Sequence, residues 1–406
     1  MKISINANRC EPSPMRKFHP LAVQAKQEGK QIFHLNIGQP DLQTPEAFYD
    51  AVRNFQDSTL AYEASPGMPV LIDAIRDYYR KLGVDLEPND VLITTGGSEA
   101  LLLTFLSILD PYTEVIIPEP YYPNYTTFVH AAGGRIRALP TSPEEGYQYA
   151  YRDRIESLIT NNTRAIMITN PGNPTGVVLT EEQMRMIADI AKKHDLFLIC
   201  DEVYREFCYD DTFGVPCMAR YRDIDENLII IDSVSKRFSA CGARVGCVVT
   251  RNKELQQALL KFCQSRLAVA TIDQLGAAAL YSVPKSYYDE SKEKYRQRRD
   301  LVVSRLRQIP GVGVEEPMGA FYLMVSLPVD DADKFQQWLL TAFEDNRQTV
   351  MFAPGAPFYE TPGKGINEVR IAYVRDLPEL ERAMELLALG IDRYRKEVMG
   401  DRKSVV

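Results

Sequence analysis

Six short apolar runs constrain the fold of this chain more than any other feature of its sequence. Nearly every side chain in these runs is apolar, so strands built from them would be buried on both faces. The runs alternate with helical patterns such as "SEALLLTFLSIL" and "TEEQMRMIADIAKKH", as expected for parallel strands joined by crossover helices. They are "VLITT" (91–95), "EVIIP" (114–118), "AIMIT" (165–169), "LFLIC" (196–200), "LIIID" (228–232) and "GCVVT" (246–250). The sequence therefore predicts an α/β fold with a mostly parallel sheet between helices.

The pattern changes in the last third of the chain. A long charged helix is expected over 285–309, followed by shorter strand and helix patterns that end in "VRIAYV" and "LERAMELLALGIDRYRKEV". This order is typical of an α+β unit, and 406 residues exceed what one core usually supports. We expect a large domain over 46–282 and a smaller α+β domain formed by 1–45 and 283–406. The step from "LIIID" to "GCVVT" is too short for a crossover helix, so one antiparallel strand is expected.

Composition argues against several classes of function. The net charge of −8 leaves no basic excess to neutralise phosphates, so we expect no nucleic-acid partner. Seven cysteines without a CxxC pair and four histidines without HExxH spacing predict neither a disulfide framework nor a metal site. No apolar run reaches membrane-spanning length, and "MKISINANRC" lacks the apolar segment of a signal peptide. We therefore expect a cytoplasmic protein without a membrane partner.

Polar residues follow the apolar runs, at the strand ends where doubly wound sheets bind ligands. After "VLITT", the glycines and Ser98 of "GGS" (96–98) open a helix whose free N–H groups could bind an anion. Ser98 can also cap that helix, so an ordinary capped turn is the alternative. After "EVIIP", the candidates for a platform under a flat ring are Tyr121, Tyr122 and Tyr125. Aromatic clusters also occur in cores and interfaces, so both interpretations stay open.

Three further runs end in residues that suit one cofactor. The rigid "NPGNPTG" loop (170–176) presents the amide of Asn173, and Asp201 ends a buried strand where a carboxylate requires a cation or several donors. Lys236 follows "LIIID", and a second cation at Arg244 would disfavour its ammonium form and free a nucleophilic amine. Taken singly, these residues also fit a turn, a cap and a solvated lysine. Gathered in one crevice, they are the parts that pyridoxal phosphate requires.

The chain resembles the class I/II aminotransferases, which are aspartate aminotransferase-like, pyridoxal-phosphate enzymes of fold type I. The resemblance covers nearly the whole chain, and its motifs are "LNIGQPDLQTP", "YEASPGMPVLIDAIRDYY", "TTGGSEALL", "PYYPNY", "NPGNPTG", "DEVY", "SVSKRFSACGARVG", "GAFYLMV" and "VRIAYV". It implies a seven-stranded sheet in the large domain, pyridoxal 5′-phosphate as the cofactor, and a homodimer.

The resemblance also implies a role for each matching residue. Lys236 would form the internal aldimine and then shuttle the substrate's proton, while Asp201 would pair with the protonated ring nitrogen. Tyr204 and Asn173 would hydrogen-bond to the phenolic oxygen, which helps to lower the imine pKa, and Tyr122 would stack on the ring.

The remaining implied residues hold the phosphate and the substrate. The phosphate ligands would be Gly97, Ser98, Ser233 and Arg244, with Ser235 as a further candidate. Tyr62 would reach the phosphate of the neighbouring subunit. Arg370 would grip the substrate α-carboxylate, and Gly38 would line the substrate pocket through its backbone, in a segment that could close as a lid.

The implied activity is transfer of an amino group from an L-amino acid to a 2-oxo acid, 2-oxoglutarate, by a ping-pong mechanism. Some bacterial aspartate aminotransferases carry a lysine after the glycines of the phosphate turn, where this chain has Ser98. The donor therefore stays open between aspartate and aromatic or other neutral amino acids, with Arg16 as one candidate for binding a side-chain carboxylate. The alternative function is a carbon–sulfur β-lyase with the same cofactor. A cofactor-binding regulator is disfavoured by the lack of a basic patch, and an inactive scaffold is the remaining alternative.

Overall fold

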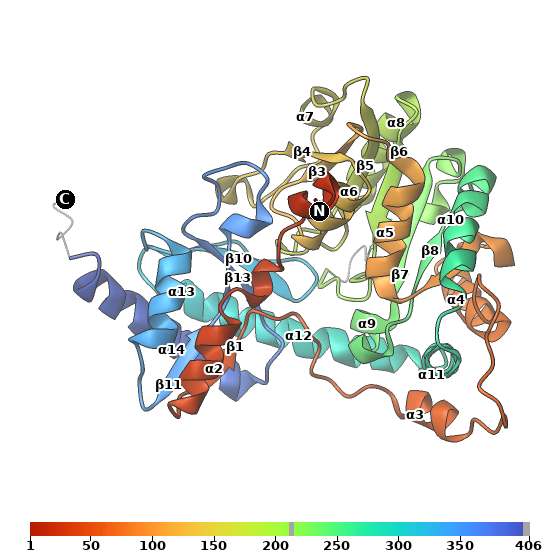
Figure 1. Cartoon of the computed structure of the whole chain (residues 1–406). Coiled ribbons are helices and arrows are strands. Elements are labelled where there is room, and N and C mark those ends of the chain that lie inside the picture. Colours follow the sequence, from red (N-terminus) through yellow and green to blue (C-terminus); the bar gives the residue numbers. More distant parts are fainter. Residues whose placement is uncertain (211–214, 401–406) are drawn as a thin grey trace.

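A seven-stranded sheet is the largest element of the computed structural model, which describes residues 1–210 and 215–400. Neighbouring strands are parallel except that β8 runs antiparallel to both β2 and β7 (Figure 1). In order across the sheet, the strands are β2 (Val91–Thr94), β8 (Gly246–Val249), β7 (Leu228–Ser233), β6 (Phe197–Asp201), β5 (Thr163–Thr169), β3 (Glu114–Pro118) and β4 (Arg135–Leu139). The predicted α/β fold is confirmed, and the antiparallel strand follows the step that is too short for a crossover.

The apolar runs are apolar throughout because helices cover both faces of the sheet. Within β5, Ala165 and Met167 belong to one core cluster, whereas Ile166 and Ile168 belong to the other. The first cluster includes residues of α5 (Gly96–Ile108), α6 (Asn124–Ala131) and α10 (Lys253–Arg266). The second includes residues of α4 (Pro69–Lys81), α8 (Glu181–Lys193) and α11 (Thr271–Leu280). The remaining α-helices of this part are α3 (Glu46–Arg53), α7 (Arg152–Glu156) and α9 (Val234–Arg237).

The seventh strand, β4, is not among the apolar runs. It pairs only with β3 at the edge of the sheet, and its sequence "RIRAL" is exposed or half-buried except at Leu139. β4 is not covered on both faces, so its sequence lacks the signal of the other strands; β2, at the opposite edge, is buried at all four positions and carries that signal.

The rest of the chain forms a second α+β arrangement with its own core cluster. Its sheets are β12 (Ala353–Pro354), β13 (Glu368–Ala372), β10 (Tyr322–Ser326) and β9 (Gly313–Val314) in that order, and the pair β1 (Gln31–His34) and β11 (Gln348–Met351). Its helices are α2 (His19–Gln27), α12 (Lys285–Leu306), α13 (Ala332–Thr341) and α14 (Leu377–Glu397). In Figure 1 these elements gather beside the large sheet, and α12 extends from among them to below that sheet.

The N-terminal segment connects both parts of the molecule. β1 pairs in parallel with β11, and α2 packs on α13, although the sequence signalled neither contact. The first helix, α1 (Ile5–Arg9), instead lies against α6, where Arg9 donates to the carbonyl of Gly134. We propose the domain division 46–282 and 1–45 with 283–406, which the β1–β11 pairing supports; the core cluster of the smaller part also takes in Tyr204, Phe207 and Tyr209 from the larger one.

Candidate active site

One cavity of about 420 Å³ opens at the carboxyl ends of the central strands. The residues expected from the sequence come to it from loops and helices that lie far apart in the chain, as the topology of a parallel sheet requires. Those that line it are Gly38, Gly97, Ser98, Tyr122, Asn173, Asp201, Tyr204, Ser233, Ser235, Lys236, Arg244 and Arg370, together with Arg16. Tyr62 does not line it: its side chain is 84% exposed, away from this chain's cavity.

The N-terminus of α5 forms one wall of the cavity. The helix begins at Gly96, with Thr95 rather than Ser98 at the capping position, so the expectation that Ser98 caps it is wrong. Ser98 lies in the first turn, where backbone N–H groups have no partner within the helix. The guanidinium of Arg244 packs so closely on this turn that a Cβ at Gly96 would lie 2.5 Å from its Nη2. A positive helix end and a cation thus face the same space, which favours an anion there.

Ser233 and Ser235 lie on the opposite side of this turn, at the end of β7. The Ser233 hydroxyl donates to the carbonyl of Val245 (3.0 Å), lies 2.8 Å from Ser235 Oγ, and accepts from the Ser235 amide through its oxygen. A Cβ at Gly246 would lie 2.6 to 2.8 Å from the backbone of the α5 turn and of Asp232, so the "GARVG" glycine allows these strands to approach the turn.

Asp201 ends β6 as a buried carboxylate that forms no salt bridge within the described part of the chain, although the charge of Lys236 acts on it. Its Oδ2 accepts a hydrogen bond of 2.6 Å from Tyr125, and its Oδ1 accepts one of 3.3 Å from the Val203 amide. Burial outweighs these donors and raises the pKa of Asp201 to about 6. Of the three tyrosines in "PYYPNY", Tyr122 and Tyr125 line the cavity, whereas Tyr121 donates to Glu360 outside it.

Lys236 lies in α9, the single helical turn that follows β7. The Ser233 hydroxyl oxygen caps this turn by accepting from the Ser235 amide, which fixes its start. The Lys236 Nζ donates to the carbonyl of Gly38 at 2.8 Å and lies 3.9 Å from the sulfur of Cys241. The amine therefore points into the cavity and bonds to the N-terminal segment, which is not the geometry of a solvated surface lysine.

Arg370 lies on β13, and its side chain lines the cavity. Its Nη1 donates to Asn173 Oδ1 (3.0 Å) and its Nη2 to the carbonyl of Asn36 (2.8 Å), while its Nε has no partner in the described structure. The guanidinium lies 4.5 Å from the ring centroid of Tyr322 and 5.0 Å from that of Phe358. It is 3% exposed and forms no ion pair with any described residue, so a buried positive charge here faces only neutral groups.

Several residues at this site carried no individual signal in the sequence. Tyr204 lies 2.9 Å from Tyr322, oxygen to oxygen, and Tyr322 belongs to "GAFYLMV", where the motif marks a strand but not a hydroxyl. Asn36 contributes its backbone carbonyl, which accepts a hydrogen bond from Arg370, and a side-chain pattern in the sequence cannot predict such a contact. Tyr125 differs from these residues, because it follows the "EVIIP" run and the sequence already suggested it as a candidate for the site.

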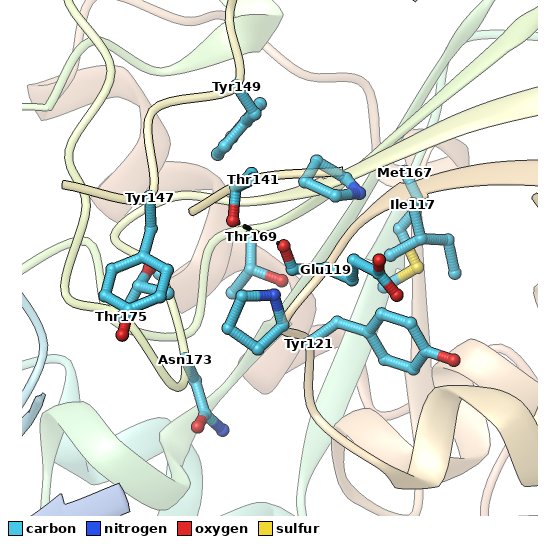
Figure 2. Close-up of a pocket in the computed structure, with 13 residues that line it drawn as sticks. Ile117, Glu119, Tyr121, Thr141, Tyr147, Tyr149, Met167, Thr169, Asn173 and Thr175 are labelled. Carbon is cyan, nitrogen blue, oxygen red and sulfur yellow. Dashed lines mark hydrogen bonds between the residues drawn. The ribbon is translucent and has the colours of Figure 1, made fainter. Parts of the chain in front are cut away.

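A second, smaller cavity adjoins the first at Asn173. Its volume is about 20 Å³, which accommodates no more than a single water molecule. Figure 2 shows that the Asn173 side chain points away from the cluster around Glu119 and Thr141 that surrounds this space. The amide of Asn173 therefore serves the larger cavity, and the smaller one is too confined for a cofactor.

Comparison with known proteins identifies the family. Residues 30–387 match the model of the family described as aminotransferase class I and II. The chain belongs to this family. The aspartate aminotransferase of Pyrococcus horikoshii is 32% identical over 89% of this chain and 91% of its own length. Among solved structures, the aspartate aminotransferase of Thermus thermophilus with maleate matches with a TM-score of 0.87 and 28% identity, over 96% of this chain and all of that one. An alanine aminotransferase of Pyrococcus furiosus matches with a TM-score of 0.86 and 30% identity, over 97% of this chain and all of that one.

The protein is therefore an aminotransferase that acts on amino acids and 2-oxo acids, and its relatives do not favour the carbon–sulfur lyase alternative. The family's cofactor is pyridoxal 5′-phosphate. The residues fit it: the N-terminus of α5 beside Arg244, the buried Asp201 carboxylate and the Lys236 amine line one cavity. In the described residues there is no group of three or more His, Cys, Asp or Glu arranged to hold a metal. No helix within those residues is long and apolar enough to span a membrane.

Proposed function

We propose that this aminotransferase moves an amino group from L-aspartate to 2-oxoglutarate, using pyridoxal 5′-phosphate bound at Lys236. The observation that carries the proposal is a pair of buried charges, Asp201 and Arg370, that line the same cavity as that lysine. Neither forms a salt bridge with a described residue, so each side chain suits a charged ligand group in this cavity.

When bound, pyridoxal phosphate supplies an aldehyde that condenses with amines and a ring that accepts the electron pair left at the substrate Cα. Asp201 is the partner proposed for the ring nitrogen, because an adjacent cation satisfies its buried charge and keeps that nitrogen protonated. Tyr125 orients the carboxylate through its 2.6 Å hydrogen bond. Without an anion at this position, the protonated nitrogen would lose its stabilising partner and the ring would accept electrons less readily.

The phenolic oxygen and the ring face have their own proposed partners. Asn173 Oδ1 is held by Arg370, so the Asn173 amide nitrogen is directed toward the cavity as a donor. Tyr204 is the second proposed donor. Tyr122 is proposed to stack on the ring, and Asn124 fixes its hydroxyl by donating to it at 2.7 Å.

The phosphate is assigned to the turn at the start of α5. The proposed ligands are the amides of Gly97 and Ser98, the hydroxyls of Ser233 and Ser235, and the guanidinium of Arg244. A helix N-terminus together with an arginine provides several donors and positive charge to a single anion.

Lys236 is proposed to do the covalent and proton chemistry. Its Nζ would hold the cofactor through the aldehyde, and as a free amine it would serve as the general base of the site. In that role it would take up the proton of the substrate Cα and return it within the same cavity. Because the amino group stays on the enzyme between the first product and the second substrate, the kinetics should be ping-pong.

The substrate is proposed to bind between Arg370 and the N-terminal segment. The planar guanidinium of Arg370 presents a fork that matches an α-carboxylate. At the same cavity, Arg16 is exposed and forms no ion pair with any described residue, so it can bind a second carboxylate. A dicarboxylic donor fits these two cations, and the related Thermus enzyme solved with maleate is named an aspartate aminotransferase.

We also propose a homodimer in which Tyr62 reaches the partner's phosphate site. The exposed fraction of Tyr62, 84%, is unusual for a tyrosine and is consistent with a contact outside this chain.

The test is to load the purified protein with pyridoxal phosphate and compare Lys236→Ala with the exposed control Lys285→Ala. We expect the first variant to lose the visible absorbance of the bound cofactor and at least about 10³-fold of turnover, and the control to lose neither. Initial rates with L-aspartate and 2-oxoglutarate should give parallel double-reciprocal lines. Pyruvate release from cysteine conjugates without an amino acceptor would contradict the proposal.

A further inference from the structure

Tyr322 lies at the centre of the site with no assigned role. Its side chain, on β10, is 2% exposed, and its hydroxyl reaches two groups of the proposed machinery. The hydroxyl lies 2.9 Å from that of Tyr204 and donates to the carbonyl of Gly38 at 3.3 Å. Gly38 O is also the acceptor for Lys236. A chain of hydrogen bonds thus runs from Lys236 through Gly38 and Tyr322 to Tyr204.

We propose that Tyr322 is a positioning residue that sets how strongly Tyr204 donates to the phenolic oxygen of the cofactor. The inference rests on the proposed role of Tyr204. Tyr322 would not touch the reacting atoms: it would act through the hydroxyl of its neighbour.

The hydroxyl hydrogens of the two tyrosines limit which bonds can form at the same time. Each tyrosine hydroxyl has one hydrogen to donate. In the arrangement described here, Tyr322 donates to Gly38 O, so the bond between the two tyrosines is donated by Tyr204. If Tyr204 instead donates to a bound phenolic oxygen, the 2.9 Å bond survives only when Tyr322 becomes its donor. A hydroxyl that accepts a hydrogen bond is a stronger donor through its own hydrogen, because the two bonds polarise each other.

Packing holds Tyr322 in this position. Its ring meets that of Tyr204 edge to face, with centroids 5.5 Å apart, and its face lies against the Arg370 guanidinium. Gly38 permits the close approach, because a Cβ there would lie 1.7 Å from the Tyr322 hydroxyl. Besides Lys236 and Arg370, the ionisable groups facing this pair include Asp201 from β6, Tyr122 from the loop before α6, and Tyr373, which directly follows β13.

The test is the pH dependence of the absorbance of the cofactor-loaded protein, which is measured without turnover. In Tyr322→Phe the ring remains and only the hydroxyl is lost. Weaker donation from Tyr204 leaves more negative charge on the phenolic oxygen, which favours protonation of the nitrogen linked to Lys236. We therefore expect the absorbance midpoint to rise by about 0.3 to 1 pH unit. Tyr373→Phe is the matched control, because its buried hydroxyl bonds to the Ala320 carbonyl away from the cavity, and its midpoint should not move.

Combined variants separate this role from a general structural one. In a Tyr204→Phe background, Tyr322→Phe should no longer shift the midpoint, because its effect passes through the Tyr204 hydroxyl. Gly38→Ala, which pushes the Tyr322 hydroxyl aside, should shift the midpoint upward without removing any hydroxyl and serves if Tyr322→Phe does not fold.

Two results would overturn the inference. One is a midpoint in Tyr322→Phe equal to that of Tyr373→Phe, and the other is a shift that persists in the Tyr204→Phe background. Failure of the proposed function has a different signature: the wild-type protein would show no absorbance band that depends on Lys236.

Discussion

Two buried arginines of this enzyme have different partners: Arg237 belongs to the structural core, and Arg370 lines the active-site cavity. Arg237 directly follows Lys236, yet it points into the core, where its Nη2 donates to both oxygens of Asp232 at 3.0 Å. Its guanidinium also lies 4.1 Å from the centroid of Tyr78. Arg370 is buried almost as deeply, but its partners are the amide oxygen of Asn173, a backbone carbonyl and two aromatic rings.

The partners of a buried arginine distinguish a charge that stabilises the fold from a charge that can bind a ligand. A buried cation with a bidentate carboxylate is already neutralised and ties two elements together. A buried cation that meets only neutral dipoles is held in place but not neutralised, so it favours an incoming anion. Asp201 and Asp232 repeat the contrast with the opposite sign: Asp232 forms a salt bridge with Arg237, whereas Asp201 has hydrogen-bond donors but no salt bridge to a described residue.

The largest effect is expected when Arg237, the structural charge, is removed from its pair with Asp232. Arg237→Met leaves the Asp232 carboxylate buried without a cation, so we expect a loss of about 3 to 5 kcal/mol in the free energy of unfolding by urea. Arg53→Met, which removes an exposed ion pair with Glu46, should cost less than about 1 kcal/mol. A loss at Arg237 no larger than at Arg53 would contradict its structural role. Adding Asp232→Leu to Arg237→Met should recover part of the stability.

The converse change removes the binding charge. Arg370→Met should lower kcat/KM for amino-acid substrates by about 10²- to 10³-fold, because the α-carboxylate loses its buried partner. The free energy of unfolding should fall by less than in Arg237→Met, since the bonds to Asn173 and Asn36 are lost but no described carboxylate loses its cation. Steady-state kinetics and urea unfolding of the same preparation measure both quantities. A large loss of stability with unchanged kinetics would place Arg370 with Arg237 as a structural residue.

The two aspartates give a comparison that depends on pH. Burial raises the pKa of Asp201 to about 6, above its unfolded value of 3.8, so its ionisation destabilises the folded, cofactor-free protein as pH rises from about 4 to 6. Asp201→Asn should therefore stabilise the cofactor-free protein by on the order of 2 to 3 kcal/mol above pH 6 and leave it unchanged below pH 4. Asp232→Asn should destabilise it at neutral pH instead. Urea unfolding between pH 4 and 8 measures both, and a gain that does not vary with pH would contradict the assignment for Asp201.

The smallest expected effect concerns an exposed charge at the rim of the same cavity. Arg16→Met should lower kcat/KM for L-aspartate by about 10- to 100-fold and change that for L-alanine by less than about threefold, because only aspartate has a second carboxylate. Equal losses of kcat/KM for both amino acids would mean that Arg16 does not bind the side-chain carboxylate of the substrate. The result would also decide between a dicarboxylic donor and the neutral or aromatic donors that the sequence left open.

The sequence was sufficient to predict most of the sheet, for a simple reason. Strands covered on both faces need an apolar residue at every position, and β5, with Ala165 to Ile168 divided between two cores, displays that requirement in its composition. The edge strand β4 lacks two covered faces and left no such signal. The parallel pairing of β1 with β11 joins segments more than 300 residues apart, and neither segment alone carries information about the other.

The site divides in the same way. The sequence by itself determined which chemistry could occur, because amine, carboxylate, amide and glycine turn follow strands whose ends a parallel sheet must gather at one edge. Which charges are paired depends on the tertiary structure. The sequence shows only that positions 237 and 370 are arginines, whereas the structure shows that Arg237 pairs with Asp232 and that Arg370 bonds to the neutral Asn173. The tertiary structure also decided that Tyr322 and the Gly38 carbonyl join the site. Both contacts depend on a distance between segments that fold together from opposite ends of the chain, and no local pattern encodes such a distance.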